Sequence, residues 1–218
     1  LTLVSGCGRP RPPGPPVPKT TEITASESTD GDKSAELKFE ESDWPMWRGA
    51  NADGIAAGPA VPTTWSESEN VVWKSKIPGR GHSSPIIIKD RIFLETADEQ
   101  QKTQSVICLD RNTGEQLWQK TLFTDNFEKE MHRENTQASS TLACDGKLVF
   151  ALFLNDRKIW ATALDLDGKQ VWQKEVGSFA AKFGYSASPV LYKSLVLLAA
   201  DHQQGGFIAA LNRADGAI

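Results

Sequence analysis

One unit of sequence, an apolar strand followed by a tight turn and a second strand, occurs twice in full. Its first copy, residues 106–118, reads Val-Ile-Cys-Leu-Asp-Arg-Asn-Thr-Gly-Glu-Gln-Leu-Trp. The apolar and partly β-branched start is typical of a strand in a buried sheet. The aspartate can accept hydrogen bonds from the amides of the turn, and the glycine can adopt the positive φ that closes it. The second copy, residues 163–172, has a turn one residue shorter.

The unit also occurs in part before and after these copies. Residues 210–216 begin a third copy, and residues 70–77 resemble the second half of another. The tryptophans that close the copies, Trp73, Trp118 and Trp172, are 45 and 54 residues apart. A period of this length, made of short strands and turns, predicts an all-β fold, a β-propeller whose blades are four-stranded antiparallel sheets. The turn residues of the repeat are Asp110, Gly114, Asp165 and Gly168.

A second marker recurs in the same phase. Ser83-Ser-Pro, Ser139-Ser-Thr and Ala187-Ser-Pro each precede an apolar stretch and are expected to open a blade. Small side chains suit the innermost strand, because the blades crowd around a central axis there. We therefore expect innermost strands at about residues 83–89, 139–143 and 188–192. Residues 71–77 are expected to form a strand of the blade that closes the ring.

A strand ending in Leu-Asp, then Thr-Gly and then Trp, resembles the repeat of quinoprotein-type propellers, known as the PQQ-like repeat. The resemblance covers roughly residues 43–218 and implies that each repeat tryptophan packs between neighbouring blades. It also implies a ring of about eight blades, of which about three are present, so that the sequence is interpreted as a fragment. Residues 43–54 also look like the leading segment of a PQQ-like subfamily from environmental bacteria. Three tryptophans are expected to anchor this region against the propeller: Trp44, Trp47 and Trp65.

Three regions of different composition divide the chain. Residues 1–7 end in Val-Ser-Gly-Cys, which matches the lipobox of a lipoprotein signal peptide and makes Cys7 the acylated residue, although so short a match also arises by chance. Residues 8–40 are rich in Pro, Ser and Thr and offer little apolar surface, which predicts a disordered tether. Residues 41–218 are expected to be the partial propeller. This layout predicts a lipid-anchored protein of a bacterial cell envelope, facing the periplasm or the exterior.

Charge and cysteine usage argue against several classes of protein. The net charge of −4 and the absence of a Lys/Arg-rich run argue against a nucleic-acid partner. The sequence has no apolar stretch long enough for a transmembrane helix. Its three cysteines are too few for a disulfide framework, and no pair is adjacent. Cys108 and Cys144 are expected to be small buried residues, which leaves no metal site assigned.

Propellers usually bind ligands at one mouth of the central channel, through the loops that lead into the innermost strands. These loops, which we name the mouth loops, are residues 79–82, 132–137 and 182–185. The alternative, which we favour, is that their polar residues are ordinary exposed loop residues. The candidate binding residues are Arg80, His82, Arg133, Glu134, Asn135 and Tyr185. The sequence contains no recognisable catalytic motif.

The resemblance implies two main functions. The first is a binding scaffold without a cofactor, whose partners are envelope proteins or a small polar ligand, as in the propeller lipoproteins of outer-membrane assembly. The alternative is a quinoprotein dehydrogenase, which implies pyrroloquinoline quinone and a calcium ion held by Glu, Asn and Asp. That ligand set does not map onto this sequence, although Asn135 and Asp201 are conceivable members. A third interpretation is the sensor or substrate-binding half of a larger protein.

Overall fold

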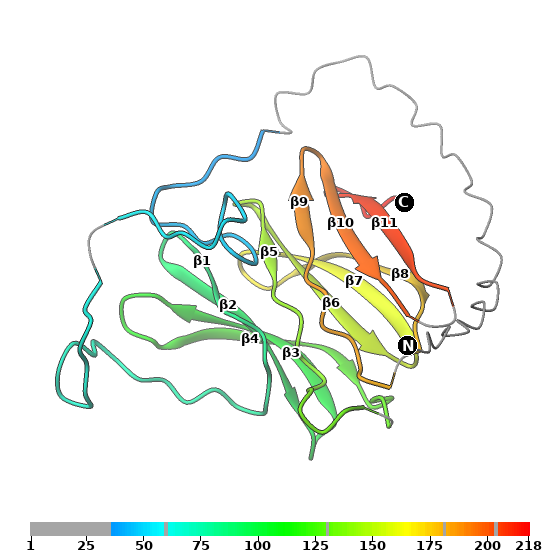
Figure 1. Ribbon diagram of the computed structural model, residues 1–218, viewed down its shortest axis with the longest axis horizontal. Helices are drawn as coiled ribbons and strands as arrows, with labels where there is room; N and C mark the ends of the chain where they lie inside the picture. Colours follow the sequence, from blue (N-terminus) through cyan, green and yellow to red (C-terminus); the bar gives the residue numbers. More distant parts are fainter. Residues whose placement is uncertain (1–35, 59–60, 130, 181, 203–204) are drawn as a thin grey trace, which may run out of the picture. The chain divides into compact units, whose positions relative to one another are not determined.

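The computed structural model describes residues 36–58, 61–129, 131–180, 182–202 and 205–218, which belong to one compact unit of the chain (Figure 1). These residues form strands and no α-helix, and no helix among them could cross a membrane. The proposed lipobox, with Cys7, and most of the proposed tether lie outside the described residues. Leu37 and Phe39, at the end of that tether, are partly buried against the core, so the packed region begins before residue 41.

The strands form three antiparallel sheets that follow one another along the chain (Figure 1). Blade one contains β1 (Ile86–Ile88), β2 (Arg91–Asp98), β3 (Thr103–Asp110) and β4 (Gln116–Thr124). Blade two contains β5 (Ala143–Cys144), β6 (Leu148–Asn155), β7 (Lys158–Asp165) and β8 (Gln170–Ser178). Blade three contains β9 (Val190–Tyr192), β10 (Leu195–Ala200) and β11 (Phe207–Asn212). The predicted propeller of four-stranded antiparallel blades is confirmed, with three strands described in blade three.

The repeat aspartates cap the turns between the third and fourth strands. Asp110 Oδ1 accepts hydrogen bonds from the amides of Asn112 and Thr113, both at 2.8 Å. These two bonds hold the pKa of the Asp110 carboxyl below its usual value. Asp165 caps the equivalent turn of blade two, and Asn212 caps that of blade three.

The repeat tryptophans connect each blade to the turn of the next. Trp118 donates from Nε1 to the Leu166 carbonyl at 3.0 Å, and its ring lies over Gly168 of the same turn. Gly168 has a φ of 83°, and a Cβ added there would lie 2.9 Å from the Trp118 ring. The turn therefore needs glycine both for its conformation and for the approach of the indole. The equivalent sets are Trp73 with Arg111 and Gly114, and Trp172 with Arg213 and Gly216.

The innermost strands are shorter than the sequence predicts. β1 begins at Ile86 rather than at Ser83, because the backbone amides of residues 82–84 donate to the segment that leads into β5 and not to β2. The amide of Ser84 donates to Thr141 Oγ1 of blade two at 3.1 Å. The amide of Thr141 in turn donates to Ser188 Oγ of blade three at 2.9 Å. The recurring Ser or Thr is thus a hydrogen-bond acceptor for the preceding blade and not merely a small residue.

The prediction of a strand at residues 71–77 is wrong. The segment contacts blade one through the Trp73 indole and through Ser75 Oγ, which donates to the Gly114 carbonyl. No described strand pairs with its backbone, and Val72 is 90 % exposed. The segment therefore makes side-chain contacts typical of a fourth strand, but its backbone forms no hydrogen bonds with a described strand.

Two hydrophobic clusters fill the spaces between the blades. Blade one packs on blade two mainly through Phe93, Val149 and Phe153. Blade two packs on blade three through a second set, which includes Phe150, Trp172, Leu191, Val196 and Leu211. Cys108 and Cys144 are buried free thiols, as predicted. Burial raises the pKa of both thiols to about 12, so neither is a reactive thiolate.

Of the three tryptophans that precede the first blade, Trp44, Trp47 and Trp65, only Trp44 anchors its segment to the propeller. Trp44 exchanges backbone hydrogen bonds with Ile87 of β1, and its ring lies against Gly49. Trp47 and Trp65 are 52 % and 71 % exposed, so the prediction that both pack on the propeller is wrong. The sequence alone could not show which tryptophan is anchored, because that depends on which backbone pairs with β1, and only the Trp44 backbone does.

Candidate functional site

The three mouth loops lie next to one another in the structure. Arg80 pairs its backbone with Ala97 at the end of β2, and its guanidinium donates to the Arg133 carbonyl of the second loop at 3.4 Å. Asn135 of the second loop donates to the Phe183 carbonyl of the third loop. The His132 and Phe183 rings also meet, with their centroids 5.5 Å apart. Loops from three blades therefore form one connected surface.

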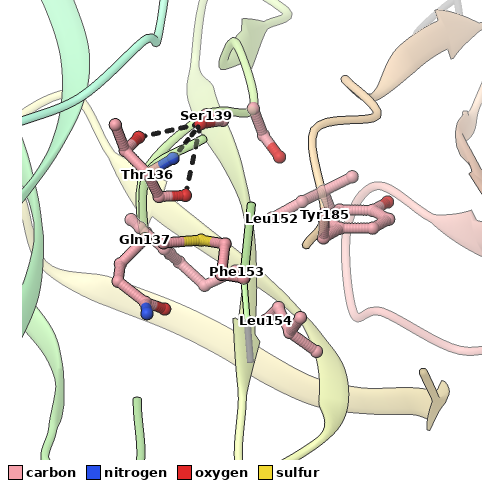
Figure 2. Close-up of a pocket in the computed structure, with 9 residues that line it drawn as sticks. Thr136, Gln137, Ser139, Leu152, Phe153, Leu154 and Tyr185 are labelled. Atoms are coloured by element: carbon pink, nitrogen blue, oxygen red, sulfur yellow. Dashed lines mark hydrogen bonds between the residues drawn. The ribbon is translucent and has the colours of Figure 1, made fainter. Parts of the chain in front are cut away.

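Asn135 holds the second loop in shape. Its side-chain oxygen accepts from the Thr136 amide at 2.8 Å and from Ser139 Oγ at 2.5 Å, while its nitrogen donates to Phe183. Figure 2 shows the further hydrogen bonds between Thr136 and Ser139, beside a cavity of about 10 Å³ that has room for about one water molecule. The Asn135 side chain is thus committed within the protein, which differs from its expected role as a ligand contact.

Tyr185 is a core residue rather than a channel-mouth residue. It is buried, its hydroxyl donates to the Ala199 carbonyl at 3.1 Å, and its ring meets Phe179 edge-on. Burial, with a smaller effect from the charge of Glu95, raises the pKa of the Tyr185 hydroxyl. Its phenol is therefore used inside blade three and does not face a ligand at the mouth, contrary to the expectation.

The other four candidates are exposed. Arg80 lies 3.8 Å from Glu99, and Arg133 lies 3.9 Å from its neighbour Glu134. Such loose and exposed pairs contribute little to stability, so the charges remain free to meet a partner. His82 is exposed and is held by its amide, which donates to the Ala138 carbonyl at 2.9 Å. Phe183 of the third mouth loop, which was not among the predicted binding residues, is 66 % exposed.

The described residues do not fit the calcium set of a quinoprotein enzyme. Among them, no three His, Cys, Asp or Glu side chains are close enough to hold a metal ion together. Asn135, one of the two conceivable ligands, is already bonded on both side-chain atoms. Asp201, the other, is exposed and belongs to no such group. We derive no chemistry through a quinone or a calcium ion from these residues.

A buried carboxyl group near the mouth was missed by the sequence analysis. Glu95 of β2 is 1 % exposed, and its Oε1 accepts from the Leu152 amide of blade two at 3.3 Å. Its Oε2 has no hydrogen-bond partner among the described residues. Burial raises the pKa of Glu95 well above its usual value, which favours the protonated form. The alternation of β2 could have revealed it, because Glu95 shares a face with Phe93 and Ala97.

The blades, their tryptophan contacts and their short innermost strands define a PQQ-like repeat β-propeller. The family model described as outer membrane protein assembly factor BamB matches the chain twice, over residues 22–121 and 100–218. These matches cover most of the sequence, so the chain belongs to this family. No curated protein sequence matches the chain.

Solved structures resemble the chain at low sequence identity. Quinohemoprotein alcohol dehydrogenase from Comamonas testosteroni aligns with 87 % of this chain and 28 % of its own, with a TM-score of 0.51 and 15 % identity. A europium-containing methanol dehydrogenase aligns with 64 % and 24 %, at a TM-score of 0.46 and 17 % identity. BamB from Moraxella catarrhalis aligns with 64 % and 62 %, at a TM-score of 0.30 and 14 % identity. The chain thus spans about a quarter of the length of these dehydrogenases.

Proposed function

We propose that this protein is a scaffold of the bacterial envelope that binds a protein partner through its mouth loops. One observation carries the proposal: the loops of three blades join into one exposed surface around Phe183. Arg80 and Arg133 flank that surface with guanidinium groups. Arginine and aromatic residues are enriched at the centres of protein interfaces, where they supply most of the binding energy. The family description, an outer membrane assembly factor, supports the same role.

The proposal includes a lipid anchor at Cys7, which would keep the propeller close to a membrane surface. The lipobox and the proline-rich stretch after it support this layout. An anchored scaffold meets membrane partners at a higher effective concentration than a free one does.

Site-specific photocrosslinking in cells tests the partner surface. A crosslinker at Phe183 should yield one discrete adduct, and Arg133→Glu in the same chain should reduce it strongly by reversing the charge beside it. Val171, an apolar residue of β8 that is also exposed, is the matched control and should give no adduct. Equal adducts at both positions would argue against the mouth loops as the interface.

The dehydrogenase alternative has its own test. The protein would be titrated with pyrroloquinoline quinone and calcium while its melting temperature is followed. A scaffold should show no saturable change, because only a ligand that binds the folded state raises the melting temperature. A saturable rise would instead favour the quinoprotein enzyme.

A further inference from the structure

The mouth loops carry charge of the opposite sign to the chain as a whole. Their cationic residues are Arg80, Arg133 and Lys182, and their one acidic residue is Glu134. Three cations against one carboxylate leave a net charge of +2 on the loops, whereas the whole chain has a net charge of −4. All four side chains are exposed. The balance stays positive when Glu99, which lies 3.8 Å from Arg80, is counted with them.

Contacts between the loops place this positive charge beside an exposed aromatic ring. Arg80 donates from its guanidinium to the Arg133 carbonyl at 3.4 Å. The residue before Arg133 is His132, whose ring lies 5.5 Å from the Phe183 ring between centroids. Phe183 is 66 % exposed, and Lys182 precedes it in the same loop. An extended segment of a few residues, at roughly 3.3 Å per residue, can therefore reach a guanidinium and the ring together.

The loop that carries Phe183 is packed closely on the second mouth loop. Asn135 donates to the Phe183 carbonyl, which fixes the backbone at that residue. A Cβ added to Gly184 would lie 2.7 Å from Asn135 Nδ2 and 2.9 Å from Met131 Cγ, so the two loops leave no room for a side chain there. The ring is therefore exposed on a fixed backbone, and little ordering is needed when a partner binds.

We propose that the protein partner presents to the mouth loops an acidic segment in which an apolar side chain lies next to a carboxylate. This inference rests on the protein-binding role proposed above and adds the chemistry of the partner. The exposed pairs of Arg80 with Glu99 and of Arg133 with Glu134 are weak, so a carboxylate of the partner can replace either glutamate. The apolar side chain covers Phe183 and removes its ring from water.

An anionic membrane is the other surface that positive charge and an exposed phenylalanine could meet. A membrane is broad, so it would also face the net charge of −4 of the whole chain, which opposes its approach. A protein segment meets the loops alone. The observations therefore favour an acidic segment, and lipid vesicles form one arm of the test.

The first test uses synthetic peptides with blocked ends, whose only charges are those of their side chains. The whole protein is titrated with acetyl-Gly-Asp-Phe-Glu-Gly-amide while the amide NMR signals of Arg133 and Phe183 are followed. We expect saturable shifts with a dissociation constant in the millimolar range or tighter. The matched peptide with Asn and Gln in place of Asp and Glu should bind about tenfold more weakly, because it lacks the charge-assisted contacts.

Three outcomes of this titration would overturn the proposal. The first is the absence of saturable shifts, and the second is equal binding of the neutral peptide. The third is a response of the same signals to phosphatidylglycerol vesicles but not to the acidic peptide, which would assign the surface to a membrane.

The second test reverses the charge of the loops. Arg80→Glu and Arg133→Glu should each weaken binding of the acidic peptide by about tenfold, and the double variant should instead bind a peptide with Lys in place of Asp and Glu. Both arginines are exposed, so the variants should keep the wild-type melting temperature. Lys147→Glu, at an exposed lysine in the turn between β5 and β6, is the matched control and should bind as the wild type does. An equal loss of binding in Lys147→Glu would overturn the proposal.

This inference and the scaffold role fail in different ways. A discrete adduct at Phe183 in cells, without binding of the acidic peptide, would overturn the acidic partner and leave the scaffold role standing. Absence of any adduct would overturn the scaffold role, and the peptide titration would still decide whether the mouth loops select acidic segments.

Discussion

Glu95 places an ionisable group in the contact between two blades. Its carboxyl group gives one acceptor to the Leu152 amide, and its second oxygen has no hydrogen-bond partner among the described residues. A buried carboxylate in that position would lack a compensating charge, which is costly in a medium of low polarity. The protein is therefore expected to keep this group protonated, and its stability should depend on pH for that reason.

The variant Glu95→Gln tests this dependence. Burial raises the folded-state pKa of Glu95, so the unfolded chain releases its proton first as the pH rises. Stability is therefore full below the ordinary pKa of about 4.3 and falls from there towards the folded-state pKa. Glutamine cannot ionise, so at pH 7 the variant should be more stable by roughly 1–3 kcal/mol, measured by urea unfolding. Near pH 4 the difference should disappear.

A matched substitution gives the control for Glu95. Glu115→Gln changes an exposed glutamate and should alter the unfolding free energy little at either pH. If Glu95→Gln behaves in the same way as Glu115→Gln at pH 7, the carboxyl group of Glu95 is not desolvated as described.

At the residue scale, the sequence predicted which residues form the turns better than it predicted which loop side chains are exposed. The roles of Asp110 and Gly168 follow from local turn chemistry, which a short stretch of sequence carries. Asn135 and Tyr185 were grouped with exposed arginines, because loop position alone does not show which side chains turn inward. Their bonds to Phe183 and Ala199 join residues 48 and 14 positions apart, and spacing gives no information on such contacts.

The segments that lead into β1 and β5 each donate a backbone hydrogen bond to the next blade. The amides of Ser84 and Thr141 would otherwise be unpaired where β1 and β5 stop pairing with their neighbours. Hydroxyl groups from the following blade accept these bonds. Backbone amides in folded proteins are nearly always hydrogen-bonded. Here a Ser or Thr hydroxyl group accepts the bond that the carbonyl of a paired strand would otherwise accept.

The variant Thr141→Val tests this replacement. Valine keeps the branched shape of the buried Thr141 side chain but cannot accept the Ser84 amide. Urea unfolding should show a loss of stability of roughly 0.5–1.5 kcal/mol, the usual net contribution of one hydrogen bond, because the partly buried Ser84 amide loses its acceptor. Thr141→Ser retains the hydroxyl group and should lose less. Equal stability of the valine variant and the wild type would contradict the role given to this hydroxyl.

At the element scale, hairpins were easier to predict than edges. The repeat turns follow from local turn residues, so the turns that join β3 to β4 and β7 to β8 lie where the sequence predicts them. The innermost strands were predicted too long, because the Ser-rich segments before them bond to the neighbouring blade. The prediction of a strand at residues 71–77 is wrong for a related reason: a segment is a strand only when its backbone is hydrogen-bonded to another strand.

The whole molecule combines the propeller with the proposed anchor at Cys7, and this part remains a prediction. In cells that process lipoproteins, Cys7→Ser should move the protein from the membrane fraction to the soluble fraction. An acylated cysteine holds a protein through its buried hydrocarbon, which serine does not acquire. Ser26→Ala, outside the lipobox, should leave the distribution unchanged. An unchanged membrane fraction for Cys7→Ser would rule out this anchor.

The tryptophan contact has a consequence for how such a protein can change in length. Trp118 contacts the turn at Gly168 in the same way as Trp172 contacts the turn at Gly216. The contact between a tryptophan and the next turn is therefore equivalent at these two blade boundaries. Loss of one complete blade would leave an indole facing a glycine turn of the same design. Gain of a blade would supply one more indole and one more turn. Duplication or deletion of a single repeat in the gene would therefore keep the tryptophan–turn contact at every remaining blade boundary, while the apolar side chains between the blades would have to repack.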